Sequence, residues 1–220
     1  MDHDQRSALS RRVTSLESLL VQRGVVTTAE LDGIVDRFVE KVGAGNGGKV
    51  VARAWVDDDF RDRLLADADT AVEELGLGQA FGFQAHRHFV VLANTPQLHN
   101  LVVCTLCSCY PSALLGPPPN WYKSDAYRAR VVRDPRGVLR EFGVRLNDEV
   151  EIRVWDSTAE TRYMVLPLRP AGTDDLSEQE LAGLVTREAL VGTAVVPTPG
   201  NPPAQRRVAS ILESNPSASP

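Results

Sequence analysis

All three cysteines of this 220-residue chain lie in one six-residue stretch, which begins at Cys104 and ends at Cys109 with Cys107 between them. Cysteines at such spacings cannot reach ordinary disulfide geometry without strain, so they are not expected to form disulfides. A Cys-x-x-Cys-x-Cys run can instead fold back on itself and direct its three sulfur atoms at one ion. The stretch therefore predicts a metal-binding loop, and the rest of the chain must build a core that positions it.

Composition narrows the class of protein. Hydrophobic residues make up 43% of the chain and charged residues 24%, which is typical of a globular protein with a buried core. The net charge of -5 gives no reason to expect nucleic acid as a partner. No apolar run approaches the roughly 20 residues that span a bilayer, so no membrane is expected. The charged N-terminus does not resemble a signal peptide, and clustered thiols without an export signal predict a cytoplasmic protein.

Amphipathic helical patterns fill the first third of the chain. Apolar residues recur at helical spacing over 9–20, and a capping box begins a second pattern over 27–39. The glycines of 43–48 are expected to break that helix, and a run of aspartates offers N-caps for a third helix over 57–75. Because isolated short helices are marginal in water, their apolar faces must be covered. They either pack on their own domain or form an arm that embraces another subunit, and both interpretations stay open.

The remainder of the chain alternates short strands with short helices. Apolar runs predict the strands, and the last two strands are expected to pair through the turn at 157–161. N-cap serines and aspartates mark three more helices. The expected strands are 88–93, 101–103, 150–156 and 162–168, and the expected helices are 124–131, 134–142 and 177–185.

Together these patterns predict an α+β fold, in which a helical N-terminal arm precedes a layered α/β sandwich-like domain that carries the metal-claw loop. The arm is expected over 1–78 and the metal-binding catalytic domain over 79–198. Residues 199–220, which are rich in proline, serine and polar residues, are expected to be a disordered tail.

The cysteine loop is compatible with several kinds of metal site. A structural zinc site needs four protein ligands, so His86, His88 or His99 would have to supply the fourth. An iron–sulfur cluster usually needs four cysteines, and the chain has three. In another arrangement, the backbone nitrogens of Ser108 and Cys109 bind the same ion as the sulfurs, and the ion must then be strongly polarising, such as a trivalent one. That claw leaves one octahedral position open for hydrolysis or hydration.

The loop and several other segments resemble the alpha subunit of nitrile hydratases. The resemblance covers nearly the whole chain, to about residue 197, and the loop motif is far more specific than a lone Cys-x-x-Cys. The matching segments are VCTLCSCY (103–110), NWYKS (120–124), YRARVVR (127–133), RYMVLP (162–167), RPAGT (169–173) and LVTR (184–187).

The resemblance assigns the ligands of a claw-type centre. It implies that Cys104 is the axial thiolate and that Cys107 and Cys109 are equatorial sulfur ligands. The backbone nitrogens of Ser108 and Cys109 would complete the plane. Cys107 would be oxidised to a sulfinic acid and Cys109 to a sulfenic acid, two steps of the cysteine oxidation ladder. Thr105 stands where iron members of the family carry serine, so the resemblance favours low-spin, non-corrin cobalt(III) over iron(III).

The activity that the resemblance implies is hydration of a nitrile to the corresponding amide. The metal would make the nitrile carbon electrophilic, and the Cys109 sulfenate oxygen or an activated water would attack it, with Ser108 also at the catalytic site. The implied partners are a nitrile hydratase beta subunit, in a heterodimer or heterotetramer, a metal-loading activator protein and a small nitrile. The alternatives are a thiocyanate hydrolase-type cobalt subunit and, in a different class, a non-catalytic zinc or iron–sulfur module.

Some positions depart from the family pattern. Ser112 stands where family members usually carry tryptophan, so the substrate is expected to be bulkier or more polar than a simple nitrile. Ala93 replaces a common glutamate, and Gln84 is a candidate for a glutamine that supports the site.

Aromatic and basic residues near the loop have competing interpretations. Trp121 and Tyr122 are interpreted as anchoring aromatics rather than as walls of the pocket. A cluster of arginines either pairs with carboxylates of a second subunit or forms a solvated helix face. These arginines are Arg128, Arg130 and Arg133.

Overall fold

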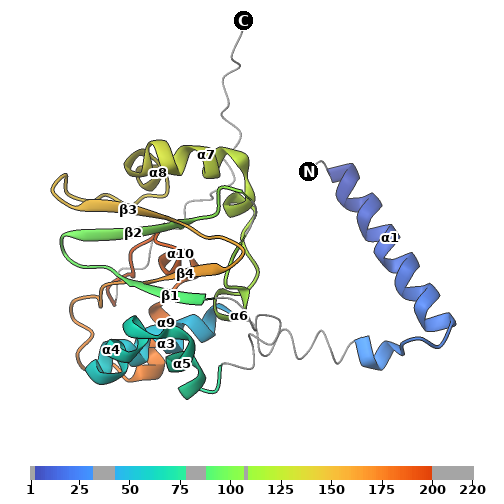
Figure 1. The fold of residues 1–220 in the computed structure, drawn as a ribbon, viewed down its shortest axis with the longest axis horizontal. Coiled ribbons are helices and arrows are strands. Elements are labelled where there is room, and N and C mark those ends of the chain that lie inside the picture. The colour runs from blue at the N-terminus through green and yellow to red at the C-terminus, as the bar shows by residue number, and fades with distance from the viewer. Residues whose placement is uncertain (1–2, 32–42, 78–87, 107–108, 200–220) are drawn as a thin grey trace, which may run out of the picture. The chain divides into compact units, whose positions relative to one another are not determined.

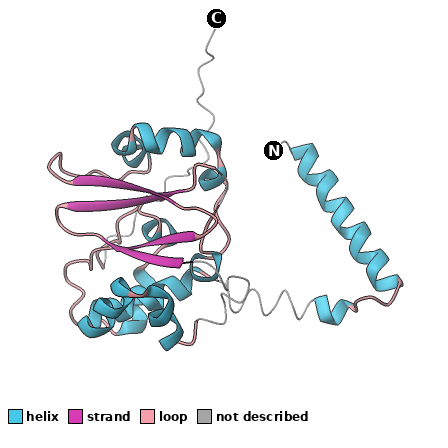
Figure 2. Ribbon diagram, viewed as in Figure 1, coloured by secondary structure: helices cyan, strands magenta, loops and turns pink. Residues whose placement is uncertain are grey.

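A computed structural model gives the fold and describes residues 3–31, 43–77, 88–106 and 109–199 (Figure 1). The chain divides into two compact units, Met1–Lys41 and Val42–Pro220. The described part of the first unit is helical, and the second unit combines helices with strands (Figure 2). The α+β class expected from the sequence is therefore confirmed.

The first unit is built around α1 (His3–Gln22), which contains the first stretch expected to be helical. Gly24, whose φ angle is +67°, follows the end of this helix. The expected capping box comes next: the Glu30 amide donates to the Thr27 hydroxyl at 3.1 Å, and the Thr27 amide donates to the Glu30 carboxylate at 2.8 Å. The start of the second expected helix is therefore confirmed, and its continuation over 32–39 lies outside the described residues.

Two sheets, each of two parallel strands, form the centre of the second unit. β1 (His88–Ala93) pairs with β4 (Thr161–Leu166), and β2 (Leu98–Val103) pairs with β3 (Glu151–Asp156). All of the expected strands are present, and β2 begins earlier than expected. Most side chains of β2 and β4 are buried, so the core lies around these two strands.

The expected pairing of β3 with β4 is wrong, although the two strands follow one another in the chain. The Ser157 amide donates to the Val103 carbonyl at 2.7 Å, which extends the β2–β3 ladder. The His88 amide donates to the Glu160 carbonyl at 2.7 Å, which begins the β1–β4 ladder. A short turn usually joins antiparallel neighbours, but residues 157–160 connect one sheet to the other. The buried strands take parallel partners from distant parts of the chain instead.

Short helices cover both sheets. They are α3 (Ala44–Val56), α4 (Asp58–Ala66), α5 (Ala68–Glu74), α6 (Ser112–Leu115), α7 (Asp125–Arg133), α8 (Pro135–Glu141), α9 (Glu178–Leu184) and α10 (Arg187–Leu190), with one 3-10 turn, η2 (Trp121–Lys123). In Figure 1, α7 and α8 lie on one side of the strands, where α8 contacts β3, and α4 and α5 lie on the other side, where they contact β1. α3 packs against α9, and α10 contacts both α3 and β4.

The sequence predicted no helix directly after the second one, but α3 begins inside the glycine-rich segment 43–48. Gly43 itself is extended, and the expected end of the second helix lies outside the described residues. A Cβ atom on Gly47 would lie 2.5 Å from a methyl carbon of Leu190, and one on Gly48 would lie 2.7 Å from the Ala182 carbonyl oxygen. Glycine in a helix costs about 1 kcal/mol relative to alanine. Here its lack of a side chain lets α9 and α10 approach the backbone of α3.

The single helix expected over 57–75 is two helices, because Asp67 ends α4 and caps α5. The Asp67 carboxylate accepts a hydrogen bond from the Thr70 amide at 3.2 Å. Asp57 caps α4 as expected and accepts from the Phe60 amide at 2.9 Å. Side-chain caps are also confirmed where the sequence predicted them, at Ser124, Asp134 and Ser177.

The division of the chain differs from the boundary expected after residue 78. α3, α4 and α5 belong to the unit that contains both sheets, since Phe60 and Leu64 are buried in one core with Phe89 and Met164. Residues 200–220 of the expected tail lie outside the described residues. Across the part of the chain that the structure describes, no helix has both the length and the apolar character needed to cross a bilayer.

Candidate metal centre

β2 leads directly into the cysteine loop. Cys104, the residue after the strand, has no exposed surface, whereas Leu106 is 89% exposed, so the chain leaves the core within two residues. Cys109, at the other end of the loop, is half-buried. Cys107 and Ser108, which were predicted as ligands, lie outside the described residues. The structure therefore describes the two ends of the predicted ligand set.

A carboxylate holds the first end of the loop. The Thr105 amide donates to Asp156 Oδ1 at 2.9 Å, and the Thr105 hydroxyl donates to the other carboxylate oxygen. Asp156 is the last residue of β3 and is in register with Val103 of β2. The β2–β3 sheet therefore places this carboxylate beside the loop. Thr105, from which cobalt was inferred, also fixes the direction in which the chain leaves the sheet.

Arg128 supports the same end of the loop from α7. Its Nη1 donates to the Thr105 carbonyl at 3.4 Å, and its guanidinium group is paired with Asp125. Arg130 also has an acidic partner within the chain, and Arg133 is exposed. Of the three arginines considered for a partner subunit, two therefore form ion pairs in their own chain.

A tyrosine holds the second end of the loop. The Tyr122 hydroxyl donates to the Cys109 carbonyl at 3.0 Å, and the Tyr122 ring meets the Tyr110 ring edge to face with centroids 4.9 Å apart. Tyr122 and its neighbour Trp121 are buried, as expected of anchoring aromatics. Burial is the largest cause that raises the pKa of the Tyr122 hydroxyl, and the nearby Cys104 thiol raises it further. The phenol therefore remains a hydrogen-bond donor at neutral pH.

Ser112, which stands in place of an expected tryptophan, begins α6 just after the loop. Its amide donates to the Tyr110 carbonyl at 2.9 Å, and its side chain is half-buried. Ala93 ends β1, and its carbonyl accepts a hydrogen bond from the Asn100 side chain at 2.8 Å. Gln84 lies outside the described residues. The departure from the family pattern at Ser112 is therefore located at the exit of the loop.

Both ring nitrogens of His99 already have partners. Nε2 lies 2.7 Å from the Gly192 carbonyl oxygen, and Nδ1 lies 3.4 Å from the Asn94 side-chain nitrogen. Burial lowers the pKa of His99, which favours a neutral ring that donates to Gly192 and accepts from Asn94. His88 is exposed at the start of β1, and His86 lies outside the described residues. The contacts of His99 therefore do not favour it as a fourth zinc ligand.

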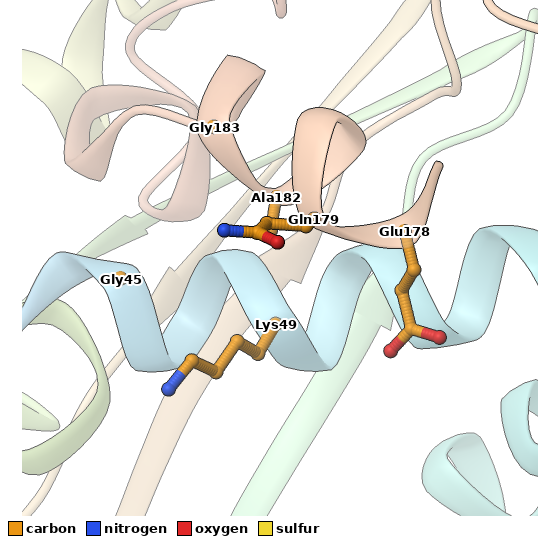
Figure 3. Close-up of a pocket in the computed structure, with 6 residues that line it drawn as sticks. All are labelled: Gly45, Lys49, Glu178, Gln179, Ala182 and Gly183. Carbon is orange, nitrogen blue, oxygen red and sulfur yellow. The ribbon is translucent and has the colours of Figure 1, made fainter. Parts of the chain in front are cut away.

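A surface pocket of about 500 Å³ lies between α3 and α9 (Figure 3). The Lys49 side chain extends from α3 beside it, and the Glu178 carboxylate is also paired with Arg53 at 3.2 Å. Its lining residues are Gly45, Lys49, Glu178, Gln179, Ala182 and Gly183. None of them belongs to the cysteine loop, so this pocket is not the candidate reaction centre.

Asp156 and Tyr122 hold the loop, but sequence reasoning did not assign either of them to the site. The sequence does show that Asp156 is a carboxylate at the end of an alternating strand. This signal could have identified Asp156 as a support of the loop only if the parallel pairing of β3 with β2 were known. Tyr122 was interpreted as an anchor, and no pattern in the sequence indicates that its hydroxyl reaches Cys109.

A family model described as "Nitrile hydratase, alpha chain" matches residues 7–194, which is most of the chain. The chain belongs to this family. Its two loop anchors therefore lie within the region that defines the nitrile hydratase alpha chain.

Individual relatives agree with this assignment. The low-molecular weight cobalt-containing nitrile hydratase subunit alpha of Rhodococcus rhodochrous is 54% identical over 191 residues, which cover 87% of this chain and 90% of that protein. The thiocyanate hydrolase subunit gamma of Thiobacillus thioparus is 42% identical over 193 residues, which cover 84% and 79% respectively. A solved structure of a double mutant of the Fe-type nitrile hydratase from Comamonas testosteroni Ni1 is similar with a TM-score of 0.78 and 44% identity, over 90% of this chain and 94% of that one. The family expected from the sequence is confirmed.

Proposed function

We propose that this chain is the metal-binding alpha subunit of a nitrile hydratase, an enzyme that adds water to a nitrile and releases the corresponding amide. The observation that carries the proposal is the Cys-Thr-Leu-Cys-Ser-Cys loop, held between Asp156 and Tyr122, in a chain that is 54% identical to a cobalt-containing nitrile hydratase subunit.

The donor set of the loop fits a strongly polarising ion. Cys104, Cys107 and Cys109 would supply three sulfurs, and the backbone nitrogens of Ser108 and Cys109 would supply the remaining ligands. Cys104 is fully buried at the end of β2, so its sulfur would bind an ion from the protein side of the loop. Thiolates are also soft ligands that suit transition metals rather than magnesium or calcium.

The ion that we propose is low-spin, non-corrin cobalt(III), with Cys107 as a sulfinic acid and Cys109 as a sulfenic acid. Thr105 and the relatives that are named cobalt-containing support this choice. Iron(III) is the alternative, because a structural neighbour is Fe-type. Metal analysis of the purified protein distinguishes the two.

In the proposed reaction, an ion held by the loop would act as a Lewis acid that makes the nitrile carbon electrophilic. The Cys109 sulfenate oxygen would either accept a proton from a water that attacks this carbon, or attack the carbon itself and be replaced by the oxygen of a water. In both cases the nitrile nitrogen takes up the two protons of that water, which gives the amide. Cys109 is half-buried and Leu106 is exposed, so the loop presents part of its surface, including an apolar side chain, to a small substrate. Ser108 would contribute its nitrogen to the ion and its hydroxyl group to the hydrogen bonding of the oxidised sulfurs.

The proposed partners follow from the family. A beta subunit would close the pocket in an alpha–beta heterodimer or heterotetramer, an activator protein would load the metal, and a small nitrile would be the substrate. A role with nucleic acid or at a membrane is not part of the proposal. A cytoplasmic location fits thiols that must stay reduced until they bind the metal.

A second candidate function is thiocyanate hydrolysis at the same cobalt loop. The 42% identity to a thiocyanate hydrolase subunit favours it, and so does Ser112 in place of the tryptophan expected at the loop exit. The two functions share the metal loop and differ in the substrate and the product.

Coexpression with a beta subunit, followed by three measurements, tests the proposal. Cobalt per chain is determined first, and then mass spectrometry of the tryptic peptide 88–123, which contains all three cysteines, measures the added oxygens. The proposal predicts one cobalt per chain, two oxygens on Cys107 and one on Cys109. Amide formation from a panel of nitriles, with thiocyanate as a parallel substrate, then separates the two candidates. Stoichiometric zinc or an iron–sulfur cluster on unmodified cysteines would contradict both.

A further inference from the structure

We propose that Tyr122 is a positioning residue for the metal loop, because its hydroxyl group holds the carbonyl of Cys109 while the nitrogen and sulfur of Cys109 face the ion. The inference rests on the proposed function, because it requires Cys109 to be a metal ligand. Tyr122 would contact neither the ion nor the substrate. The inference also gives a role to the proline segment that precedes Tyr122.

Tyr122 belongs to an aromatic cluster with Trp121 and Tyr127, and it contacts the second end of the loop. Its hydroxyl donates to the Cys109 carbonyl at 3.0 Å, and its ring packs edge to face against Tyr110, which directly follows Cys109. Tyr122 has no exposed surface, so water does not compete for the bond. One side chain therefore restrains the Cys109 carbonyl and the residue that follows it.

The backbone that carries Tyr122 is itself rigid. Three consecutive prolines end at Pro119, and proline fixes its own φ angle. The Tyr122 amide donates to the Pro119 carbonyl at 3.1 Å, which closes the turn of η2. The neighbouring Trp121 ring packs edge to face against Tyr127 and Phe142, with centroids 4.9 and 4.8 Å away. The phenol is therefore held at a fixed point beside Cys109.

The restraint matters because Cys109 would bind through two atoms of one residue. A chelate of its nitrogen and sulfur fixes the rotation about the Cα–Cβ bond, and a carbonyl held at a fixed point restrains the Cα atom that carries both groups. Without the hydrogen bond the carbonyl would be buried without this partner, and the loop would sample other rotations.

Tyr127 offers a matched control. Its hydroxyl also donates to a backbone carbonyl, that of Val102 at 2.9 Å, and it is buried in the same aromatic cluster. Its ring centroid lies 5.9 Å from that of Tyr122. Tyr122→Phe and Tyr127→Phe therefore remove the same group from the same surroundings, but only Tyr122→Phe frees a carbonyl of the metal loop.

The experiment uses the complex with the beta subunit in three forms: the unaltered protein, Tyr122→Phe and Tyr127→Phe. Cells are grown over a range of cobalt concentrations, and cobalt per chain and the visible sulfur-to-cobalt absorption band are measured after purification. Tyr122→Phe is expected to require about fivefold more cobalt for half-loading, the ratio that corresponds to one ordinary hydrogen bond, and to shift the band. Tyr127→Phe is expected to keep the loading curve and the band while lowering the unfolding temperature to a similar extent.

The outcomes separate the inference from the proposed function. If the unaltered protein binds no cobalt, the proposed function fails and this inference fails with it. If the unaltered protein binds cobalt and Tyr122→Phe matches it in loading and absorption, only the role of Tyr122 is wrong. Equal shifts in both variants would also overturn it. Pro119→Ala is the second variant in case Tyr122→Phe does not fold, since it keeps the hydroxyl but loosens the turn; a smaller shift in the same direction supports the inference, and no shift contradicts it.

Discussion

α1 and α3 are both helices with apolar residues at helical spacing, but these residues are exposed in α1 and buried in α3. Val13 and Leu16 of α1 are more than half exposed, whereas Val50 and Val51 of α3 have no exposed surface. α1 also has the regular pattern that sequence analysis recognises easily, and α3 begins in a segment that was expected to break a helix. A regular apolar stripe therefore predicts a helix but not whether the helix's own unit covers it.

The difference lies in what can approach each helix. Gly47 and Gly48 let α9 and α10 pack directly on the backbone of α3, and the Gly47 position also lies close to the carbonyl of Leu114 in α6, just after the metal loop. α3 is therefore part of the support on which the loop exit rests. Within the described residues of its own unit, the apolar stripe of α1 is exposed, and we propose that α1 is an arm that embraces a partner subunit.

The largest effect on this comparison is expected from Gly48→Ala. A Cβ atom there would lie 2.7 Å from the backbone oxygen of Ala182, and backbone moves less readily than a side chain. Overpacking of this kind costs about 1–3 kcal/mol, which should exceed the gain of about 1 kcal/mol in helix propensity. Urea unfolding measures the change. Gly45→Ala in the same helix is the control, because no atom lies within 4 Å of its added Cβ, and it should not destabilise the protein.

Gly47→Ala should destabilise the second unit less than Gly48→Ala. The Cβ atom would first meet the end of the Leu190 side chain at 2.5 Å, which can rotate away, and then the Leu114 carbonyl at 3.0 Å. We expect a loss of about 1 kcal/mol in the free energy of unfolding. A loss equal to that of Gly48→Ala would indicate that the side chain of Leu190 has no room to move.

A smaller and pH-dependent effect is expected from His99, which links β2 to Gly192, two residues after α10. Its pKa is lowered by burial in the folded chain, and the unfolded value is about 6.5. The contribution to stability is therefore complete above the unfolded pKa and is lost as the pH falls through the folded pKa. Unfolding free energies from pH 8 to pH 5 should decline less steeply in His99→Gln than in the unaltered protein. Parallel curves would show that His99 does not carry this dependence.

The smallest effect on the isolated chain is expected from Leu16→Glu in α1. Because Leu16 is exposed, the free energy of unfolding should change by no more than about 0.5 kcal/mol. Association with the beta subunit should weaken, since the charge would interrupt the apolar stripe, and sedimentation of the mixture measures this. Ser18→Glu adds the same charge on the other face of α1 and should leave association unchanged. Equal association in both variants would contradict the partner-facing role of α1.

Local signals in the sequence predicted local structure well. Asp57, Ser124, Asp134 and Ser177 cap helices as expected, because a capping side chain bonds to an amide only a few residues away. The same reasoning failed for the strand pairs and for α3. Parallel pairing joins segments that are far apart in the chain, so local patterns do not reveal it. The glycines of α3 are explained only by the close packing of α9 and α10 on them, which is also a long-range contact.

In the candidate site, too, the sequence predicted the local features but not the long-range contacts. The position and ligands of the loop were predicted because its three cysteines are neighbours in the sequence, and the family resemblance assigned their roles. Its supports could not be found in this way. Asp156 reaches Thr105 across 51 residues, and Tyr122 reaches Cys109 only after the proline segment has turned the chain back.

The pairing of Thr105 with Asp156 has a consequence for the order of assembly. A chain made from its N-terminus presents all three cysteines long before Asp156 exists, and β2 cannot form its ladder until β3 has been synthesised. The cysteines are therefore synthesised early, while the carboxylate that holds Thr105 arrives late. Insertion of the proposed ion into the anchored loop would have to follow this docking, and a nascent chain shorter than 156 residues would carry the cysteines without it.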